Sequence, residues 1–205
     1  MLDGKISNAE LMVWFEMGLA GAAVLGGVIW GLIKFLKRKS NKKDYFKSHS
    51  RIYETLTELR VKTDCARAQL VQFHNGEYFM DGISMRRKSL THESLNGGVS
   101  GEADRKQNLQ LSLFIPLMNI ILEDSGKLVM THDQPDTYCK SYMENSSVVS
   151  FMALPLKTKN EISGYLMIQW CSLSKSDDIN EEECTKILGK SRDLINIQLS
   201  QQPKK

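Results

Sequence analysis

The sequence predicts an α+β protein in which a single N-terminal transmembrane helix precedes a domain with a central antiparallel sheet flanked by N- and C-terminal helices. Two observations carry this prediction: a charge-free apolar stretch at residues 17–33, and two apolar runs, 148–156 and 162–170, joined by a short polar turn. A chain of 205 residues has room for one ordinary domain beside such a helix. Its 25% of charged residues is normal for globular proteins and argues against intrinsic disorder.

The apolar zone extends over residues 11–36 and contains only two charged residues. The charge-free part, 17–33, spans about 25 Å as a helix, close to the roughly 30 Å hydrocarbon core of a bilayer. We therefore predict a short tail over 1–10 and a transmembrane helix over 11–36. A cleaved signal peptide is the alternative, but its basic region would precede the apolar core, whereas the basic cluster of this chain follows it.

Six basic residues and no acidic residue lie between positions 34 and 43. Because Lys and Arg beside a span are retained on the cytoplasmic side, the N-terminus of a single-pass protein should face out and the domain should be cytoplasmic. The same cluster attracts anionic headgroups, so a lipid membrane is an expected partner. These residues are Lys34, Lys37, Arg38, Lys39, Lys42 and Lys43.

Small residues recur every four positions in the predicted membrane helix, a spacing that lets two helix backbones approach closely. One hypothesis is a homodimer formed through this helix. The alternative is that Gly and Ala are simply common in membrane spans. The residues concerned are Gly18, Ala22, Gly26, Gly27 and Gly31.

A basic stretch and a connecting helix are predicted over residues 37–63. Tyr45, Ile52, Leu56 and Leu59 recur there at helical spacing, with polar residues between them. Because this helix follows the apolar zone directly, we expect it to continue the membrane helix as one rod.

The first strands of the domain follow. Residues 66–73 predict a strand ended by the turn-forming pair Asn75-Gly76, and residues 85–93 predict a second, more polar strand. Residues 94–104 are rich in glycine and predict a loop.

The later elements alternate between helix and strand. Pro116 marks the first turn of a helix within residues 107–123. A short strand is predicted over 126–130 and a short helix over 136–145. The hairpin at 148–170 comes next, and both of its arms are apolar at nearly every position, as in strands covered on both faces.

A terminal helix begins after Asn180, whose side chain suits an N-cap, and three glutamates occupy its first turn. Apolar residues at helical spacing predict its buried face: Cys184, Ile187, Leu188, Leu194, Ile195 and Leu199.

The hairpin segment FMALPLKTKNEISGYLMIQW (151–170) and the acid-capped helix after it resemble the end of a GAF domain, a relative of the PAS fold. In that family, a strand with an apolar-Pro-Leu step turns through a charged loop into a Gly-containing strand and then into the C-terminal helix. Residues 52–73 resemble the opening helix and strand. The resemblance implies a GAF-like domain over 64–200 and a tail over 201–205. Residues 76–136 depart from familiar ligand-binding members, so no ligand is implied.

The polar ends of the two predicted strands supply candidate ligand-binding residues: His74 and Asn75 on the first strand, His92 and Glu93 on the second. One hypothesis is a polar cluster of these four residues at a pocket mouth. The alternative is turn chemistry, in which the backbone at Asn75-Gly76 adopts positive φ and His74 caps exposed backbone groups.

Other motifs carry weaker signals. The run Arg86-Arg87-Lys88 suits a phosphate, but alternation sends Arg87 opposite to its neighbours, and a solvated strand edge is expected instead. The four cysteines contain no C-x-x-C pair, so we predict reduced thiols, no metal site and no cofactor. Beyond residue 43 the chain has 20 basic and 21 acidic residues, which argues against nucleic-acid binding.

The leading hypothesis is a bacterial or phage signalling protein. Its membrane-anchored, GAF-like sensory module would bind a small molecule or a protein at the cytoplasmic membrane face. The alternative is a phage holin-like lysis protein, which also has a short N-terminus, one span and a globular C-terminal domain. Such holins place the domain outside, which the basic cluster opposes. No catalytic motif occurs, so we do not expect an enzyme.

Overall fold

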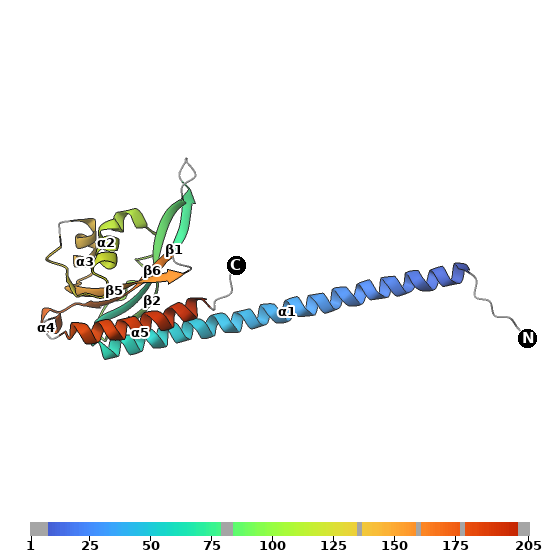
Figure 1. Cartoon of the computed structure of the whole chain (residues 1–205), viewed down its shortest axis with the longest axis horizontal. Helices are drawn as coiled ribbons and strands as arrows, with labels where there is room; N and C mark the ends of the chain where they lie inside the picture. Colours follow the sequence, from blue (N-terminus) through green and yellow to red (C-terminus); the bar gives the residue numbers. More distant parts are fainter. Residues whose placement is uncertain (1–7, 79–83, 135–136, 159–160, 177–178, 201–205) are drawn as a thin grey trace, which may run out of the picture. The chain divides into compact units, whose positions relative to one another are not determined.

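The computed structural model of the chain (Figure 1) describes residues 8–78, 84–134, 137–158, 161–176 and 179–200. Within these stretches, the side chains that are not described are those of residues 8–11, 13–25, 36–44, 77, 84 and 176. The chain divides into two compact units, which are Met1–Phe46 and Lys47–Lys204.

The first unit contains the N-terminal part of helix α1 (Asn8–Lys62). The helix runs without a break through the predicted membrane and connecting segments, as expected. Large apolar side chains between residues 28 and 35 are exposed, from 48% at Ile33 to 65% at Trp30 and Phe35. Among the residues that the structure describes, no helix is both long enough and apolar enough to cross a membrane.

The predicted helix-packing and headgroup residues belong to this unit. An added Cβ at Gly26, Gly27 or Gly31 would meet no atom within 4 Å. The side chains at Gly18 and Ala22 lie outside the described set. The same is true of the basic cluster beyond Lys34, which comprises Lys37, Arg38, Lys39, Lys42 and Lys43. Helix dimerisation and headgroup binding therefore stay predictions.

The second unit is built on one antiparallel sheet of six strands in the order β3-β2-β1-β6-β5-β4. The strands are β1 (Arg67–Tyr78), β2 (Ser84–Leu95), β3 (Leu109–Gln110), β4 (Val129–Met130), β5 (Ser150–Thr158) and β6 (Glu161–Trp170). β1 pairs with both β2 and β6, so it joins the N-terminal hairpin to the C-terminal one. The predicted strands and the long C-terminal hairpin are confirmed, whereas the short β3 was not predicted.

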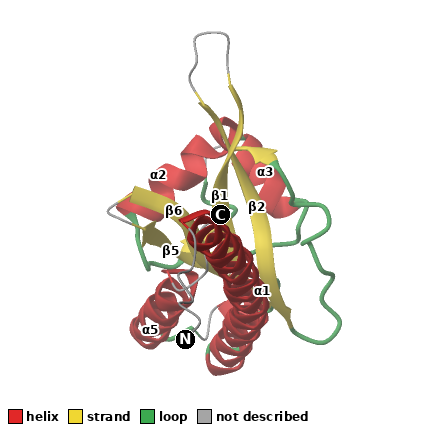
Figure 2. Ribbon diagram, turned by 90° about the vertical axis from the view of Figure 1, so that its right-hand side faces the viewer, coloured by secondary structure: helices red, strands yellow, loops and turns green. Residues whose placement is uncertain are grey.

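Helices cover both faces of the sheet (Figure 2). On one face lie α5 (Glu181–Ser200) and the last part of α1, where the Ser48 hydroxyl donates to the Gln198 backbone oxygen at 3.0 Å. The other face carries the 3-10 helix η1 (Leu111–Phe114), α2 (Ile115–Glu123) and α3 (Tyr138–Glu144). A single turn, α4 (Leu173–Ser176), follows β6. The predicted α+β class, with a sheet flanked by N- and C-terminal helices, is confirmed.

Two predicted helix starts are also confirmed. Pro116 occupies the first turn of α2, where its missing N–H leaves no helical hydrogen bond unmade. Asn180 caps α5, because its side-chain oxygen accepts a hydrogen bond from the Glu183 backbone N–H at 3.1 Å.

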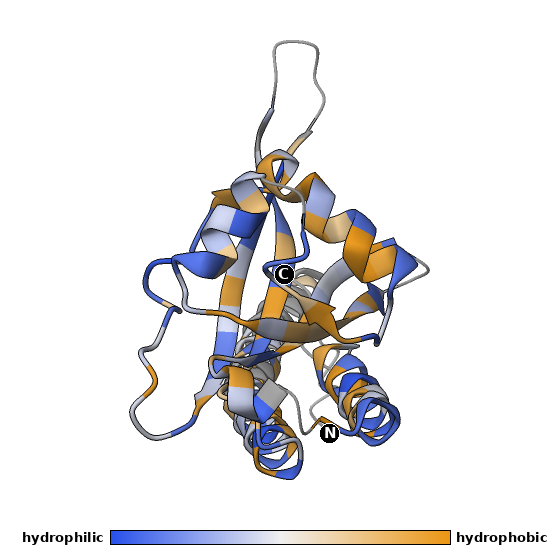
Figure 3. Cartoon of the chain, turned by 90° about the vertical axis from the view of Figure 1, so that its left-hand side faces the viewer, coloured by the Kyte–Doolittle hydropathy of each residue, from blue (hydrophilic) through white to orange (hydrophobic). Residues whose placement is uncertain are grey.

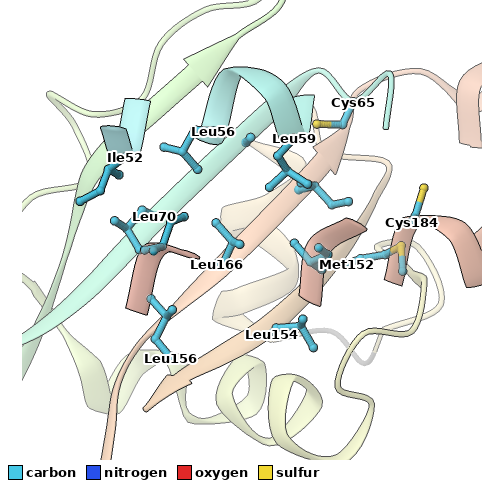
Figure 4. Close-up of a cluster of buried hydrophobic side chains, with 14 of the residues drawn as sticks. Ile52, Leu56, Leu59, Cys65, Leu70, Met152, Leu154, Leu156, Leu166 and Cys184 are labelled. Carbon is cyan, nitrogen blue, oxygen red and sulfur yellow. The ribbon is translucent and has the colours of Figure 1, made fainter. Parts of the chain in front are cut away.

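The core between the sheet and helices α1 and α5 is apolar (Figure 4). Ile52, Leu56 and Leu59 of α1 are fully buried against strand residues that include Leu70 and Leu166. Each such side chain contributes about 1.5–3 kcal/mol to folding relative to an exposed one. Figure 3 shows hydrophilic and hydrophobic residues on both helices beneath the sheet, as expected when one helix face packs on a core.

Two sequence predictions about individual positions are wrong. Leu194, predicted on the buried face of the terminal helix, is 50% exposed. Asn75-Gly76 is not a turn, because β1 continues to Tyr78. Glycine is required there for another reason: an added Cβ at Gly76 would lie 2.6 Å from the backbone oxygen of Met85 on β2.

A second close backbone approach is at Gly164 of β6. An added Cβ there would lie 2.1 Å from the Val71 backbone oxygen on β1, well inside van der Waals contact. Only a residue without a side chain fits between these strands.

We predict that Gly164→Ala lowers the free energy of unfolding by about 1–3 kcal/mol, because the strands must separate to admit the methyl group. Gly189→Ala on α5 is the matched control. It has open space and should raise the same quantity by about 0.5–1 kcal/mol, since Ala favours helix. Urea denaturation measures both, and equal stabilities of the two variants would contradict the prediction.

Candidate functional site

His74 and Asn75 lie on the exposed part of β1. Together with Arg86 and Glu161 they line a wide surface hollow of about 470 Å³. A His74 ring nitrogen (Nε2) lies 2.9 Å from the Ser89 hydroxyl. These two predicted residues therefore do border a hollow, as the pocket-mouth hypothesis expects of them.

His92 lies elsewhere and faces α1. It pairs with Leu70 on β1, whereas His74 pairs with Arg87, so the two histidines are separated by four positions of β1, or about 13 Å. The structure does not bring His74 and His92 into one cluster. Strands β1 and β2 do pair, but the two histidines lie at different positions along the paired strands.

The partner of His92 is His49 on α1. His92 Nε2 lies 2.6 Å from His49 Nδ1, and the Tyr53 ring packs beside it. Thr91 donates to the Leu70 backbone oxygen, so its hydroxyl can accept from His92 Nδ1, which leaves His92 Nε2 as the acceptor from His49. Burial, and then the neighbouring His49, lowers the pKa of His92 to about 4. The pair is therefore neutral at pH 7 and joins α1 to the sheet.

Glu93, the fourth predicted residue, serves the loop after β2. Its carboxylate accepts hydrogen bonds from the backbone N–H groups of Glu102 and Ala103 at 2.9 and 3.2 Å, and from the Gln69 side chain at 2.8 Å. Glu93 thus fixes a tight loop turn against the sheet, and this turn holds the charged residues described next.

The most unusual residue of the α2/α3 face is Lys88 on β2, which is 2% exposed. Its ammonium group donates to the Tyr165 hydroxyl at 3.0 Å and lies 3.3 Å from the centre of the Phe114 ring. Burial, and then the charge of Lys106, lowers the pKa of Lys88 to about 7. The expectation of a solvated strand edge at Lys88 is wrong, because η1 and α3 cover this face.

A buried ion pair lies beside Lys88. Lys106 pairs with Glu102, which is 1% exposed and also accepts from Gln69 at 2.9 Å. Burial alone would raise the pKa of Glu102, but the Lys106 ammonium and these hydrogen bonds outweigh burial and lower it. Both ammonium groups lie near the Tyr142 ring, with ammonium-to-centroid distances of 4.9 Å for Lys88 and 4.2 Å for Lys106.

Arg67 is the third buried cation, and it donates to the backbone oxygens of Ser100 and Ser146 at 3.2 and 2.9 Å. Among the described residues, three buried cations thus face one fully buried carboxylate, that of Glu102, and the half-buried Glu93. We call these five charged residues, together with Gln69, the polar centre. It contains one more basic than acidic residue in the domain interior.

Two spaces adjoin the polar centre. A void of about 10 Å³ lies between Lys88, Lys106 and Gln169, room for about one water molecule. Beside it, an open hollow of about 200 Å³ is bordered by Arg105, Lys106 and side chains of α3. Lys106 and Tyr142 border both spaces. The residues around Lys88 therefore fill the interior next to the polar centre and leave room only beside it.

Sequence reasoning missed the polar centre and His49. Lys88 was considered as part of a basic run, but Glu102 and Lys106 lie in a loop with no motif. The four cysteines are unpaired, as predicted. No group of three or more metal-ligating residues occurs in the part of the chain that was described.

The arrangement of the second unit matches known structures. It is similar to the GAF domain of PixJ from Thermosynechococcus elongatus in its blue-light-absorbing form, with TM-score 0.52, 11% identity, 77% of this chain and 89% of that chain covered. A far-red cyanobacteriochrome photoreceptor has TM-score 0.52, 14% identity and coverages of 82% and 98%. A far-red-absorbing dark state with bound biliverdin has TM-score 0.54, 14% identity and coverages of 79% and 98%.

No protein-family model and no curated protein matches the chain. At 11–14% identity, the structural likeness concerns the fold alone. The element order, the six-stranded antiparallel sheet and the helices on its two faces agree with it. The GAF-like architecture expected from the C-terminal hairpin is therefore confirmed: the second unit has the GAF fold.

Proposed function

We propose that the chain is a membrane-anchored sensory module whose GAF-fold domain binds a small anionic ligand at the hollow beside Lys106. The excess of basic over acidic residues in the polar centre carries this proposal. A buried cation without a paired anion lowers the stability of the folded protein. This cost suggests that the residue has a role other than stabilising the fold. A carboxylate or phosphate at the hollow would supply the missing negative charge.

The geometry supports a small ligand. The hollow of about 200 Å³ lies below the roughly 300–1,000 Å³ of sites for drug-sized molecules. One structural neighbour holds biliverdin, but side chains such as Lys88 and Tyr142 occupy the interior of this domain. The exposed Arg105 borders the hollow and suits an anionic group that enters from solvent. The buried Lys106 also borders it, together with Glu102, the carboxylate with which it pairs.

We further propose that α1 anchors the module through residues 11–36 and that the domain faces the cytoplasm. The exposed apolar side chains between Val28 and Phe35 support anchoring, because they occupy successive positions and so point to all sides of the helix. The basic cluster that begins at Lys34 supports the orientation. Gly27 and Gly31, with open space around them, suit a second copy of the helix.

Lys88 should make stability depend on pH. The pKa of Lys88 is about 7 in the folded protein and about 10.5 unfolded, so between these values the unfolded chain binds more protons. The free energy of unfolding should therefore rise with pH over this window, by up to about 1.4 kcal/mol per unit. Lys88→Met should be more stable than the parent by about 1–4 kcal/mol at pH 6.5. Its free energy of unfolding should not show this rise with pH.

Urea denaturation of both proteins between pH 6.5 and 9.5 measures this effect. Lys127→Met, at an exposed lysine paired with Asp124, is the control and should follow the parent at every pH. A constant difference between Lys88→Met and the parent across the window would contradict the burial of a titrating amine.

Ligand binding can be tested on the full chain with inorganic phosphate, acetate, citrate, AMP and uncharged adenosine. At least one anion should raise the melting temperature of the protein to a plateau as its concentration increases, and adenosine should not raise it. Arg105→Gln should weaken that binding about tenfold, whereas Arg51→Gln, at an exposed arginine of α1, should leave it unchanged. No response to any anion, or equal effects of AMP and adenosine, would refute an anion site.

Anchoring can be tested in bacterial membranes washed with alkaline carbonate. Paired substitutions Ile29→Asp and Ile33→Asp should release the protein, because each charge at membrane depth costs about 2.5–3.5 kcal/mol. Val61→Asp, at an exposed apolar site of α1 in the second unit, should leave it bound. Protease added to spheroplasts should not cleave the domain, and cleavage from outside would instead favour the holin-like alternative.

A further inference from the structure

A separate, partly open pocket lies between α2, α3, β4 and β5 and has a volume of about 130 Å³. Its walls include Pro116 and Ile120 of α2, Met143 of α3 and Phe151 of β5. We call it the apolar pocket. It shares no lining residue with the hollow beside Lys106, although α3 borders both, so the two are separate sites.

One polar atom in the apolar pocket has no partner. The Thr131 side chain is 3% exposed, and its hydroxyl oxygen is buried without a hydrogen bond in the described structure. The backbone of Thr131 is satisfied, because its N–H donates to Val149 at 2.9 Å and its carbonyl accepts from Gln134 at 3.3 Å. An unmade hydrogen bond at a buried hydroxyl is costly. Because the oxygen has almost no accessible surface, an occupant of the pocket bonds to it only when the Thr131 side chain rotates toward the pocket.

The other polar side chains at the pocket are engaged. Gln134 donates to the Met130 backbone oxygen at 3.4 Å, and the Thr137 hydroxyl accepts from the Lys140 N–H at 3.3 Å. The Lys140 ammonium donates to the His132 backbone oxygen. Cys139 also lines the pocket, and burial raises the pKa of its thiol, so the sulfur is a neutral, weakly polar wall atom.

We propose that the apolar pocket binds one small, largely apolar molecule, about the size of a six-membered ring, that makes a single hydrogen bond to the Thr131 hydroxyl. The volume supports this size, since a dry apolar cavity of about 150 Å³ is enough to hold benzene. The chemistry follows from the walls, which offer dispersion contacts on several sides and one unpartnered hydroxyl. A cation would lose its hydration and find no acidic residue among these wall residues, and the one basic wall residue, Lys140, already donates to the His132 backbone oxygen.

The test uses phenol and benzene on the full chain in nanodiscs, with free probe concentrations fixed by dialysis. The Met143 methyl signal in NMR reports occupancy, because this buried side chain borders the pocket. Phenol should bind about two- to tenfold more tightly than benzene, since it can hydrogen-bond to Thr131. Thr131→Val preserves the shape and removes the hydroxyl, so it should abolish this preference and leave benzene affinity unchanged.

Two further variants locate the binding. Thr55→Val, at a helical threonine bonded to the Arg51 backbone oxygen, is the matched control and should keep the phenol preference. Cys139→Leu should fill the pocket and abolish binding of both probes. The proposal is overturned if neither probe shifts Met143, if Thr131→Val keeps the preference for phenol, or if either probe still binds to Cys139→Leu.

Discussion

The pairing of β1 with β6 is the constraint on which the rest of this domain depends. Each of the two long hairpins is local in sequence, but their junction pairs Arg67 with Gln169 across about a hundred residues. The junction needs Gly164, because the Val71 carbonyl occupies the space that a side chain would fill. Once it forms, one continuous sheet exists, and the helices on both sides have a surface on which to pack.

Most elements of the fold could be predicted because their signals are local. Apolar residues on both faces of β5 and β6 predicted that both faces of the sheet are covered. Alternate residues of β6 do pack into the cores on opposite faces, with Leu166 in one and Tyr165 in the other. The predictions for individual positions failed where the local sequence pattern did not reflect the tertiary contacts of the residue. Asn75-Gly76 has the composition of a turn, but the glycine serves the close approach of β2. Leu194 fits the helical period of α5, yet no element covers it among the described residues.

The candidate site could be predicted only in part. His92 was chosen because it ends a polar strand, but its partner His49 lies 43 positions earlier on α1, and no periodicity links the two. The alternation of a strand correctly sends Arg87 and Lys88 to opposite faces. It does not say which face a helix covers, so the burial of Lys88 was not predictable. The charges that surround it come from an irregular loop.

The two faces of the sheet differ in chemistry: one packs apolar side chains, and the other holds charged and polar groups. The core under α1 and α5 is built on apolar side chains such as Leu56 and Leu166. The face under α2 and α3 holds Lys88, the Lys106–Glu102 pair and the unpartnered oxygens of Thr131 and Gln169. A domain held together by the first face can tolerate costly polar groups on the second. Bound molecules on that face would act directly on α3, the helix that borders both spaces.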